Sequence, residues 1–290
     1  MTIKVLTNVR ADSFFLALWI AHYGALFGKE NLHVMFDGDD WQPDCDVTGV
    51  NVHVVRDVPR VRGDRLKFTA IWQSRLANAL LKGGVQTVLR TDIDEFVAVD
   101  PRANQSLPDY LVALPEGAMC AALGVDVIQG PQEGALDHSL PILGQRCNAV
   151  LTREFSKLVA VRAPLRWAGG FHRGRNVPIA IGPDLLLFHL ALFDRDVAAR
   201  RIAGRADILQ DASQGSHIRT RLDRFADVAG MEPLAFDAVA ERARSAIEQS
   251  VPSRSGPHPG FISDGNVERG YHVLLPDRMR DVLPAVKAAG

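Results

Sequence analysis

A single apolar run that ends in three closely spaced carboxylates limits which folds the chain can adopt. The run covers Val85–Phe96, and Asp92, Asp94 and Glu95 lie at its end. Valine and leucine favour strands, and the preceding Gly83-Gly84 is typical of a helix end. We therefore predict a buried strand that delivers the acids to one edge of a sheet.

The spacing of Asp92 and Asp94 indicates a metal site. On extended backbone, side chains two residues apart share one face at a spacing of about 6 to 7 Å. Two such carboxylates repel each other, and a hard divalent ion such as Mg²⁺ or Mn²⁺ between them removes that conflict. An exposed acidic turn after a strand has the same sequence pattern, and an Asp-x-Asp pair alone does not separate the two interpretations.

Strands and helices alternate along the first hundred residues. We expect strands at 3–9, 32–36, 50–55, 85–89 and 96–99, and helices from 12 or 13 to 28, at 66–82 and from 106. This alternation is typical of a Rossmann-like α/β fold with a mixed, mainly parallel sheet flanked by helices. No G-x-G-x-x-G follows the first strand, so the dinucleotide fingerprint is missing.

The middle of the chain is more irregular. Strands are expected at 118–128, 155–161 and 185–190, and a long polar loop at 129–148. Loops of more than about 15 residues are usually functional or mobile. His189 lies in the last of these strands, where a histidine is more often a core residue than a ligand. Its position near the end of a strand keeps the ligand role open.

The last third of the sequence is mainly helical. Helices are expected from Asp194 or Asp196 to about 209, at 216–228, at 233–247 and at 278–288, with a loop at 253–260. This change predicts two units, an α/β domain over residues 1–195 and a mainly helical extension over residues 196–290 that packs on it.

Composition excludes several functional classes. The formal charge of −1 argues against a nucleic-acid binder that works through a basic field. No apolar run approaches the roughly 20 residues that a transmembrane helix needs. The three cysteines have no C-x-x-C spacing, and the first residues lack the features of a signal peptide. We therefore expect a cytoplasmic protein without a transmembrane segment.

Several short motifs occur in an order that resembles one enzyme family. They are Asn8-Val9-Arg10, Trp19-Ile20-Ala21-His22-Tyr23, Asp37-Gly38, Thr91-Asp92-Ile93-Asp94-Glu95-Phe96, Phe155-Ser156-Lys157, Gly170-Phe171-His172 and Leu187-Phe188-His189. Over residues 3 to 195 the set is similar to the GT-A-fold glycosyltransferases, in particular the family 2-like and family 92-like group.

This resemblance implies a metal-dependent glycosyltransferase that takes a sugar from a nucleotide-diphosphate donor. The acceptor would be a glycan, a lipid-linked hydroxyl or another hydroxyl. The metal, Mn²⁺ or Mg²⁺, would be held by Asp92, Asp94 and His189, with Asp92 alternatively on the ribose. Contacts to the nucleotide and its phosphates would come from Asn8, Arg10, Asp12, Asp37, Asp92, Lys157 and His172, and Arg173 or Arg175 could add positive charge.

An inverting transferase also needs a carboxylate base for the acceptor hydroxyl. The candidates are Asp126, Glu133 and Asp137, and we expect the 129–148 loop to border the acceptor site. The chain lacks the Glu-Asp pair that marks the base in many family 2 enzymes, so the base and the stereochemical course stay open.

Two other functions use similar residues. A haloacid-dehalogenase-type phosphatase also places Asp-x-Asp at a strand end with magnesium, but on the first strand and followed by Thr or Val. Here the pair begins at Asp92 and is followed by Glu95, which weakens that interpretation. A non-catalytic nucleotide-sugar-binding module is the other alternative.

Overall fold

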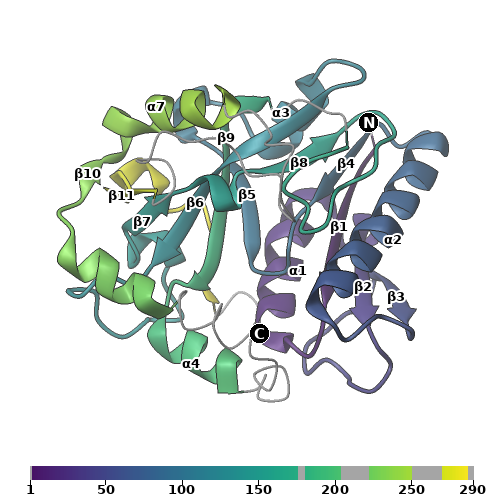
Figure 1. Cartoon of the computed structure of the whole chain (residues 1–290), viewed down its shortest axis with the longest axis horizontal. Coiled ribbons are helices and arrows are strands. Elements are labelled where there is room, and N and C mark those ends of the chain that lie inside the picture. The colour runs from purple at the N-terminus through teal and green to yellow at the C-terminus, as the bar shows by residue number, and fades with distance from the viewer. Residues whose placement is uncertain (1, 176–179, 204–221, 250–269, 287–290) are drawn as a thin grey trace.

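The chain forms a mixed α/β structure in which helices flank one large, twisted sheet (Figure 1). A computed structural model describes residues 2–175, 180–203, 222–249 and 270–286. The predicted fold class is confirmed. The loop predicted at 253–260 and parts of the helices predicted at 194–209 and 216–228 lie outside the described residues.

The strands and helices have the following bounds. The strands are β1 (Ile3–Val9), β2 (Leu32–Asp37), β3 (Asn51–Val55), β4 (Thr87–Arg90), β5 (Glu95–Val99), β6 (Met119–Ile128), β7 (Asn148–Leu151), β8 (Lys157–Val161), β9 (Ile181–Leu192), β10 (Leu234–Ala235) and β11 (Tyr271–Leu274). The helices are α1 (Ser13–Phe27), α2 (Arg62–Lys82), α3 (Leu107–Ala113), α4 (Arg195–Ala203) and α7 (Phe236–Gln249), and residues 222–230 are also helical.

The sheet has a parallel half and an antiparallel half. Within the described residues its strand order is β10-β11-β7-β6-β8-β4-β1-β2-β3, and the pairs among β4, β1, β2 and β3 are parallel. β8 lies antiparallel between β4 and β6. β5 pairs antiparallel with β9, which also runs parallel to β6. This pairing places Glu95 opposite His189.

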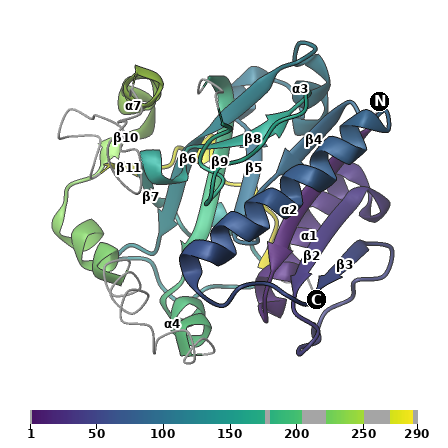
Figure 2. The same ribbon diagram turned by 45° about the vertical axis from the view of Figure 1, so that its right-hand side comes forward.

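The two faces of the parallel half are covered by different helices. Val5 and Leu89 pack in one apolar cluster with the buried face of α1, whereas Leu6 and Val88 pack in another with α2. Successive residues of a strand point to opposite faces, which explains this division. Figure 2 shows α2 crossing in front of the strands. Both faces are therefore buried, and the polar ends of the strands are left for function.

Local signals explain most helix ends. α1 begins after Asp12, whose Oδ1 accepts a hydrogen bond from Phe15 N, and it ends at Gly28 with φ of 84°. α4 begins after Asp194, whose Oδ1 accepts from the backbone N–H of Val197. α2 starts at Arg62, about one turn before the expected 66. Side-chain caps of this kind satisfy N–H groups that have no partner inside the helix.

The C-terminal part joins the same sheet and the same core. β11 pairs antiparallel with β7, and α7 buries Phe236 in the main apolar cluster. The helix predicted at 278–288 is wrong. Asp277–Met279 forms a short 3₁₀ helix and turns follow it, because Pro284 removes an N–H and clashes within a helix interior. The domain boundary near residue 195 stays a prediction.

None of the helices within the described ranges combines the length and the apolar character that crossing a membrane requires.

Candidate functional site

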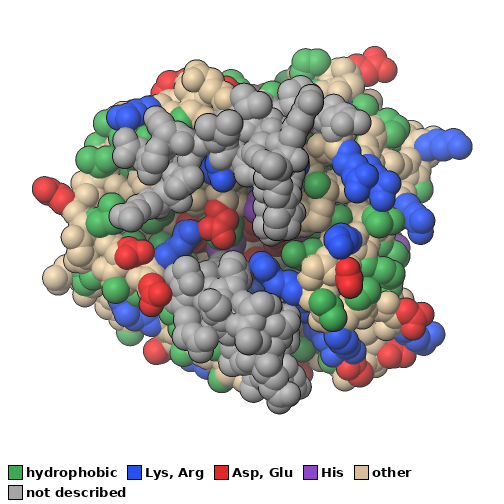
Figure 3. Space-filling view, in the orientation of Figure 1, with side chains coloured by type: hydrophobic (Ala, Val, Ile, Leu, Met, Phe, Trp, Pro, Cys, Tyr) green, Lys and Arg blue, Asp and Glu red, His purple; other side chains and the backbone are tan. Residues whose placement is uncertain are grey.

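Most of the predicted site residues lie where β1, β2 and β4 end and where β5 meets β9. Parallel strands bring their carboxyl ends to one edge, which is the usual position of ligand sites in α/β sheets. The space-filling view shows a hollow on this face with acidic, basic and histidine side chains in it (Figure 3). The site is built from three linked groups of charged side chains.

Asp92 and Asp94 lie in a turn between β4 and β5, which corrects the expectation that they share the face of one strand. Glu95 N donates to Asp92 O across this turn. Trp19 of α1 anchors its start, because the indole N–H donates to Thr91 Oγ1 at 2.9 Å. The turn sends the two aspartates to different partners.

Asp92 lies between two cations. Its Oδ1 is 2.5 Å from Arg90 Nη2 and its Oδ2 is 2.5 Å from Lys157 Nζ. Burial alone would raise the pKa of Asp92, but Arg90 and Lys157 outweigh it and hold the pKa well below its ordinary value. Asp92 is thus a neutralised carboxylate with both oxygens engaged.

Lys157 also serves Glu95, the third acid of the motif. Its Nζ lies 2.6 Å from Glu95 Oε1, an ion pair without hydrogen-bond alignment, and Glu95 Oε2 accepts from Asp92 N. Burial, and then the charge of Asp92, raises the pKa of Glu95. Burial would lower the pKa of Lys157, but the two carboxylates outweigh it and raise it. Lys157 holds two acids together at the base of the site.

Arg90 joins this group to the first strand. The side-chain oxygen of Asn8 accepts from Arg90 Nη2 and from Gln73 Nε2, both at 3.0 Å. The Arg90 guanidinium lies 3.1 Å from the ring centroid of Phe171. His172, the next residue, is half-buried. The predicted residues Asn8, Lys157 and Asp92 therefore belong to one network, and His172 borders it.

Asp94 meets His189 in the second group. His189 Nε2 lies 3.7 Å from Asp94 Oδ2, and its Nδ1 lies 2.6 Å from Asp126 Oδ1. Because a carboxylate can only accept, Nδ1 carries the proton of this bond and Nε2 faces Asp94. Phe155 stacks on the His189 ring with centroids 3.8 Å apart. Asp126 is fully buried and also pairs with Arg224 at 2.6 Å.

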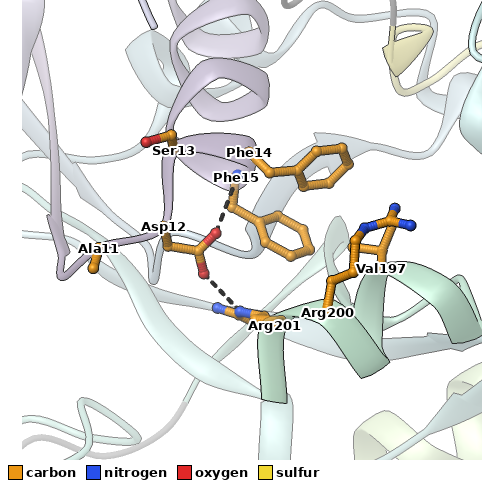
Figure 4. Close-up of a pocket in the computed structure, with 8 residues that line it drawn as sticks. All are labelled: Ala11, Asp12, Ser13, Phe14, Phe15, Val197, Arg200 and Arg201. Atoms are coloured by element: carbon orange, nitrogen blue, oxygen red, sulfur yellow. Dashed lines mark hydrogen bonds and ion pairs between the residues drawn. The ribbon is translucent and has the colours of Figure 1, made fainter. Parts of the chain in front are cut away.

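Asp94 also takes part in the third group, in which Arg201 bridges two acids. Arg201 Nη1 lies 2.5 Å from Asp94 Oδ2, and Arg201 Nε lies 2.6 Å from Asp12 Oδ2. Figure 4 shows Arg201 reaching from α4 toward Asp12 at the start of α1. Burial would lower the pKa of Arg201, but Asp94 and Asp12 outweigh it and raise it. The guanidinium holds α4 against the carboxyl end of β1.

Arg10 and Asp37 form a separate contact at the end of β2. Arg10 Nη1 donates to Asp37 O, and its two terminal nitrogens donate to the two carboxylate oxygens of Asp40 at 2.8 Å. The Asp37 side chain is buried, which raises its pKa despite the nearby charge of Arg10. Arg10 and Asp37 are thus together, as expected, but apart from Asp12.

The 129–148 loop has its own internal order. Glu133 Oε1 accepts from the backbone N–H groups of Cys147 and Asn148, and its Oε2 accepts from Gly130 N. Asp137 Oδ1 accepts from the backbone and hydroxyl of Ser139. These bonds close the loop on itself, so Glu133 has a structural role. The catalytic roles of Asp126, Glu133 and Asp137 stay predictions.

The predicted metal ligands fit a divalent ion only in part. Within the described ranges no three His, Cys, Asp or Glu side chains gather closely enough to hold a metal ion. Asp94 and His189 do lie together, with Asp126 fixing the ring as carboxylates behind a metal-binding histidine commonly do. Both oxygens of Asp92 face cations instead. Mg²⁺ often takes one or two protein ligands and completes its shell with substrate phosphates and water, so the Asp94–His189 pair fits such an ion and Asp92 does not.

Three arginines of the site have little signal in the sequence. Arg90 interrupts an apolar strand just before the acids, and a charge at such a position is a usable signal because buried arginines are usually paired. Arg201 is one of several arginines on α4, and Arg224 lies on the helix at 222–230. Neither carries a local mark that separates it from a surface arginine.

Comparisons with known proteins identify no family. The sequence matches no family model and no curated protein. Two similar structures are mannose-1-phosphate geranyltransferase from Thermus thermophilus, with 15% identity over 48% of each chain and a TM-score of 0.28, and CMP:2-keto-3-deoxy-manno-octonic acid synthetase complexed with CTP, with 13% identity over 86% of this chain and 99% of the other and a TM-score of 0.27. The first match spans about half of that protein. At these scores neither protein carries an activity or a ligand over to this chain.

Proposed function

We propose that this chain is a glycosyltransferase that moves a sugar from a nucleotide-diphosphate donor to an acceptor hydroxyl with the help of Mn²⁺ or Mg²⁺. One observation carries the proposal: Asp94 faces His189 Nε2 at 3.7 Å at the edge of the sheet, next to a network that contains Lys157 and Arg90. A carboxylate and an imidazole suit a divalent ion, and the neighbouring cations suit phosphate oxygens.

The leaving nucleoside diphosphate gains negative charge as the sugar departs. Asp94 and His189 would hold the divalent ion, which neutralises phosphate charge as a Lewis acid. Lys157 has three N–H donors, and two of them face Asp92 and Glu95. The third is available for a phosphate oxygen. Asp126 acts as a positioning residue, because its bond to Nδ1 fixes the His189 ring.

The nucleoside would lie over the ends of β1 and β2. Asn8 and Asp37 are at the carboxyl ends of these neighbouring strands, and Arg10 ties the two loops together through its bond to Asp37 O. A buried carboxylate such as Asp37 is suited to accept hydrogen bonds from ribose hydroxyls. Asp92 would support this side of the site through Arg90 and Lys157.

The predicted inverting course requires a base on the acceptor side. Asp126 is committed to His189 and Arg224, and Glu133 to the backbone of its own loop. Asp137 is exposed, so it has the most accessible carboxylate of the three candidates. Base and stereochemistry are carried forward as predictions.

The test is a calorimetric titration of nucleoside diphosphates (UDP, GDP, CDP, ADP and dTDP) with and without Mn²⁺. We expect Mn²⁺-dependent binding of at least one of them, weakened at least about tenfold by Asp94→Asn and by His189→Ala, since ligand-shell changes typically cost 10- to 100-fold. Asp281→Asn, an exposed aspartate outside the site, is the control and should bind as the wild type does.

The same protein samples separate the alternatives. Incubation with the matching nucleotide sugar should release the sugar slowly to water only when Mn²⁺ or Mg²⁺ is present. Release of inorganic phosphate from p-nitrophenyl phosphate without any nucleotide would favour the phosphatase. Tight nucleotide-sugar binding with no turnover, even with a broad set of acceptors, would favour the binding module. Unchanged affinity in Asp94→Asn would refute the assignment of the site.

A further inference from the structure

A pocket between α1 and α4 lies beside the site and takes no part in the proposed donor contacts. Residues 11–15 at the start of α1 form one wall, and Val197, Arg200 and Arg201 of α4 form the other (Figure 4). The empty space, including its open mouth, is about 600 Å³. Sites for small molecules typically measure about 300–1,000 Å³, so the pocket has the size of a ligand site.

The pocket is connected to Asp94 through a single side chain. Arg201 lines the pocket, and its Nη1 lies 2.5 Å from Asp94 Oδ2. A molecule that fills the pocket is therefore separated from the Asp94–His189 pair by one guanidinium. This places the occupant on the reacting side of the proposed transferase.

The loop after β1 divides the pocket from the proposed nucleotide contacts. Ala11 has φ of 47°, a left-handed conformation that turns the chain sharply. Before this turn Arg10 reaches toward β2, where it binds Asp37 O and Asp40. After it Asp12 faces α4 and binds Arg201. The pocket therefore belongs to the acceptor and not to the nucleoside.

The walls offer an aromatic surface and an exposed cation. Phe14 is half-buried and lines the pocket next to Phe15, and aromatic rings pack against the C–H face of sugars. Arg201 is shared by two carboxylates. Within the described ranges the exposed Arg200 has no ion pair. A guanidinium binds carboxylate or phosphate through two parallel hydrogen bonds.

We infer that this pocket, in an argument that rests on the proposed function, binds the acceptor as a saccharide with an anionic substituent, with Phe14 against the sugar ring and Arg200 on the carboxylate or phosphate. The neutral part of the acceptor then lies toward Arg201 and Asp94. Arg200 is a specificity-determining residue, because it distinguishes acidic from neutral acceptors without contacting the donor.

The test measures saccharide binding by saturation-transfer NMR without nucleotide. The probes are methyl glucuronide, glucose 6-phosphate and methyl glucoside, which separate carboxylate, phosphate and neutral ligands. We expect the neutral probe to bind at least about tenfold more weakly than one anionic probe. Arg200→Gln should remove that preference, since hydrogen bonds to charged groups contribute about 1.5–3 kcal/mol. Phe14→Leu should weaken all three probes, and Arg75→Gln, an exposed arginine on α2, should change nothing.

A nucleotide competition experiment shows where the probe binds. Saturating nucleoside diphosphate with Mn²⁺ should leave the saccharide signal in place, whereas displacement would mean that the probe occupies the phosphate contacts, and this would overturn the inference. Equal binding of neutral and anionic probes, or wild-type binding by Arg200→Gln, would also overturn it. If saccharide binding survives but no Mn²⁺-dependent nucleotide binding is found, the proposed function fails and the pocket stands. The reverse pattern rejects the pocket alone.

Discussion

Replacement of Lys157 by methionine tests whether this lysine holds the base of the site together. Methionine keeps the length of the side chain and removes the charge. The lost ammonium lies 2.5 Å from Asp92 Oδ2 and 2.6 Å from Glu95 Oε1. Asp92 keeps Arg90 at 2.5 Å, so the main cost falls on Glu95, which is 1% exposed.

The expected loss follows from the burial of this pair. Removing one partner of a buried ion pair costs about 3–5 kcal/mol, and we take about 3 because Asp92 retains Arg90. In a chain of this size each kcal/mol lowers the Tm by about 2 °C, which gives a Tm reduction of about 6 °C at pH 8. Differential scanning calorimetry measures it. Lys67→Met, an exposed lysine on α2, should stay within about 1 °C of the wild type.

The pH dependence gives the prediction its sign. Without the ammonium the pKa of Glu95, which burial and Asp92 already raise, rises further. A carboxyl group with a folded-state pKa above its unfolded value binds more protons in the native state, so the variant regains stability as pH falls toward about 5. Lys157→Met with Glu95→Gln should recover about half of the loss at pH 8. Equal Tm losses at both pH values, together with no recovery in the double variant, would refute the reasoning.

Three further predictions concern other buried groups. Burial lowers the pKa of His22 to about 4, so the wild type should lose up to about 3 kcal/mol relative to His22→Leu as pH falls from about 6.5 to 4, and parallel pH profiles in urea unfolding would contradict this. Arg146→Met should cost about 3–5 kcal/mol because it leaves Asp194 without its buried partner at 2.9 Å; a change below about 1 kcal/mol in the same assay would show that the pair contributes little. Gly124→Ala should lower the Tm by several degrees because its Cβ would lie 2.4 Å from a backbone carbon, whereas Gly63→Ala, with nothing within 4 Å, should not lower it.

The sequence predicted the elements whose ends carry local chemical signals. Asp12 caps α1 and Gly28 ends it, as expected, because these residues act on the backbone beside them. The turn at Asp92 to Asp94 was missed because it depends on Trp19, which is distant in the chain. β11 was missed because a four-residue edge strand becomes visible only through its partner β7.

The candidate site was predictable to the extent that its residues lie at strand ends. Asp94 and His189 were expected together, and the β5–β9 pairing brings them together. The different partners of Asp92 were not foreseen, since two cations from β4 and β8 reach it only after the sheet has formed. Arg201 could not be singled out, because a helix with several arginines does not reveal which one faces the protein.

The pairing of β5 with β9 also determines when the site can form during folding. β1, β2, β3 and β4 pair among themselves within the first third of the chain, and short-range contacts form early. Asp94 must wait for β9, which the ribosome makes long after β5. A nascent chain can thus complete the parallel strands before His189 has been synthesised, and it gains the Asp94–His189 pair only with the later, slower closure of the antiparallel half.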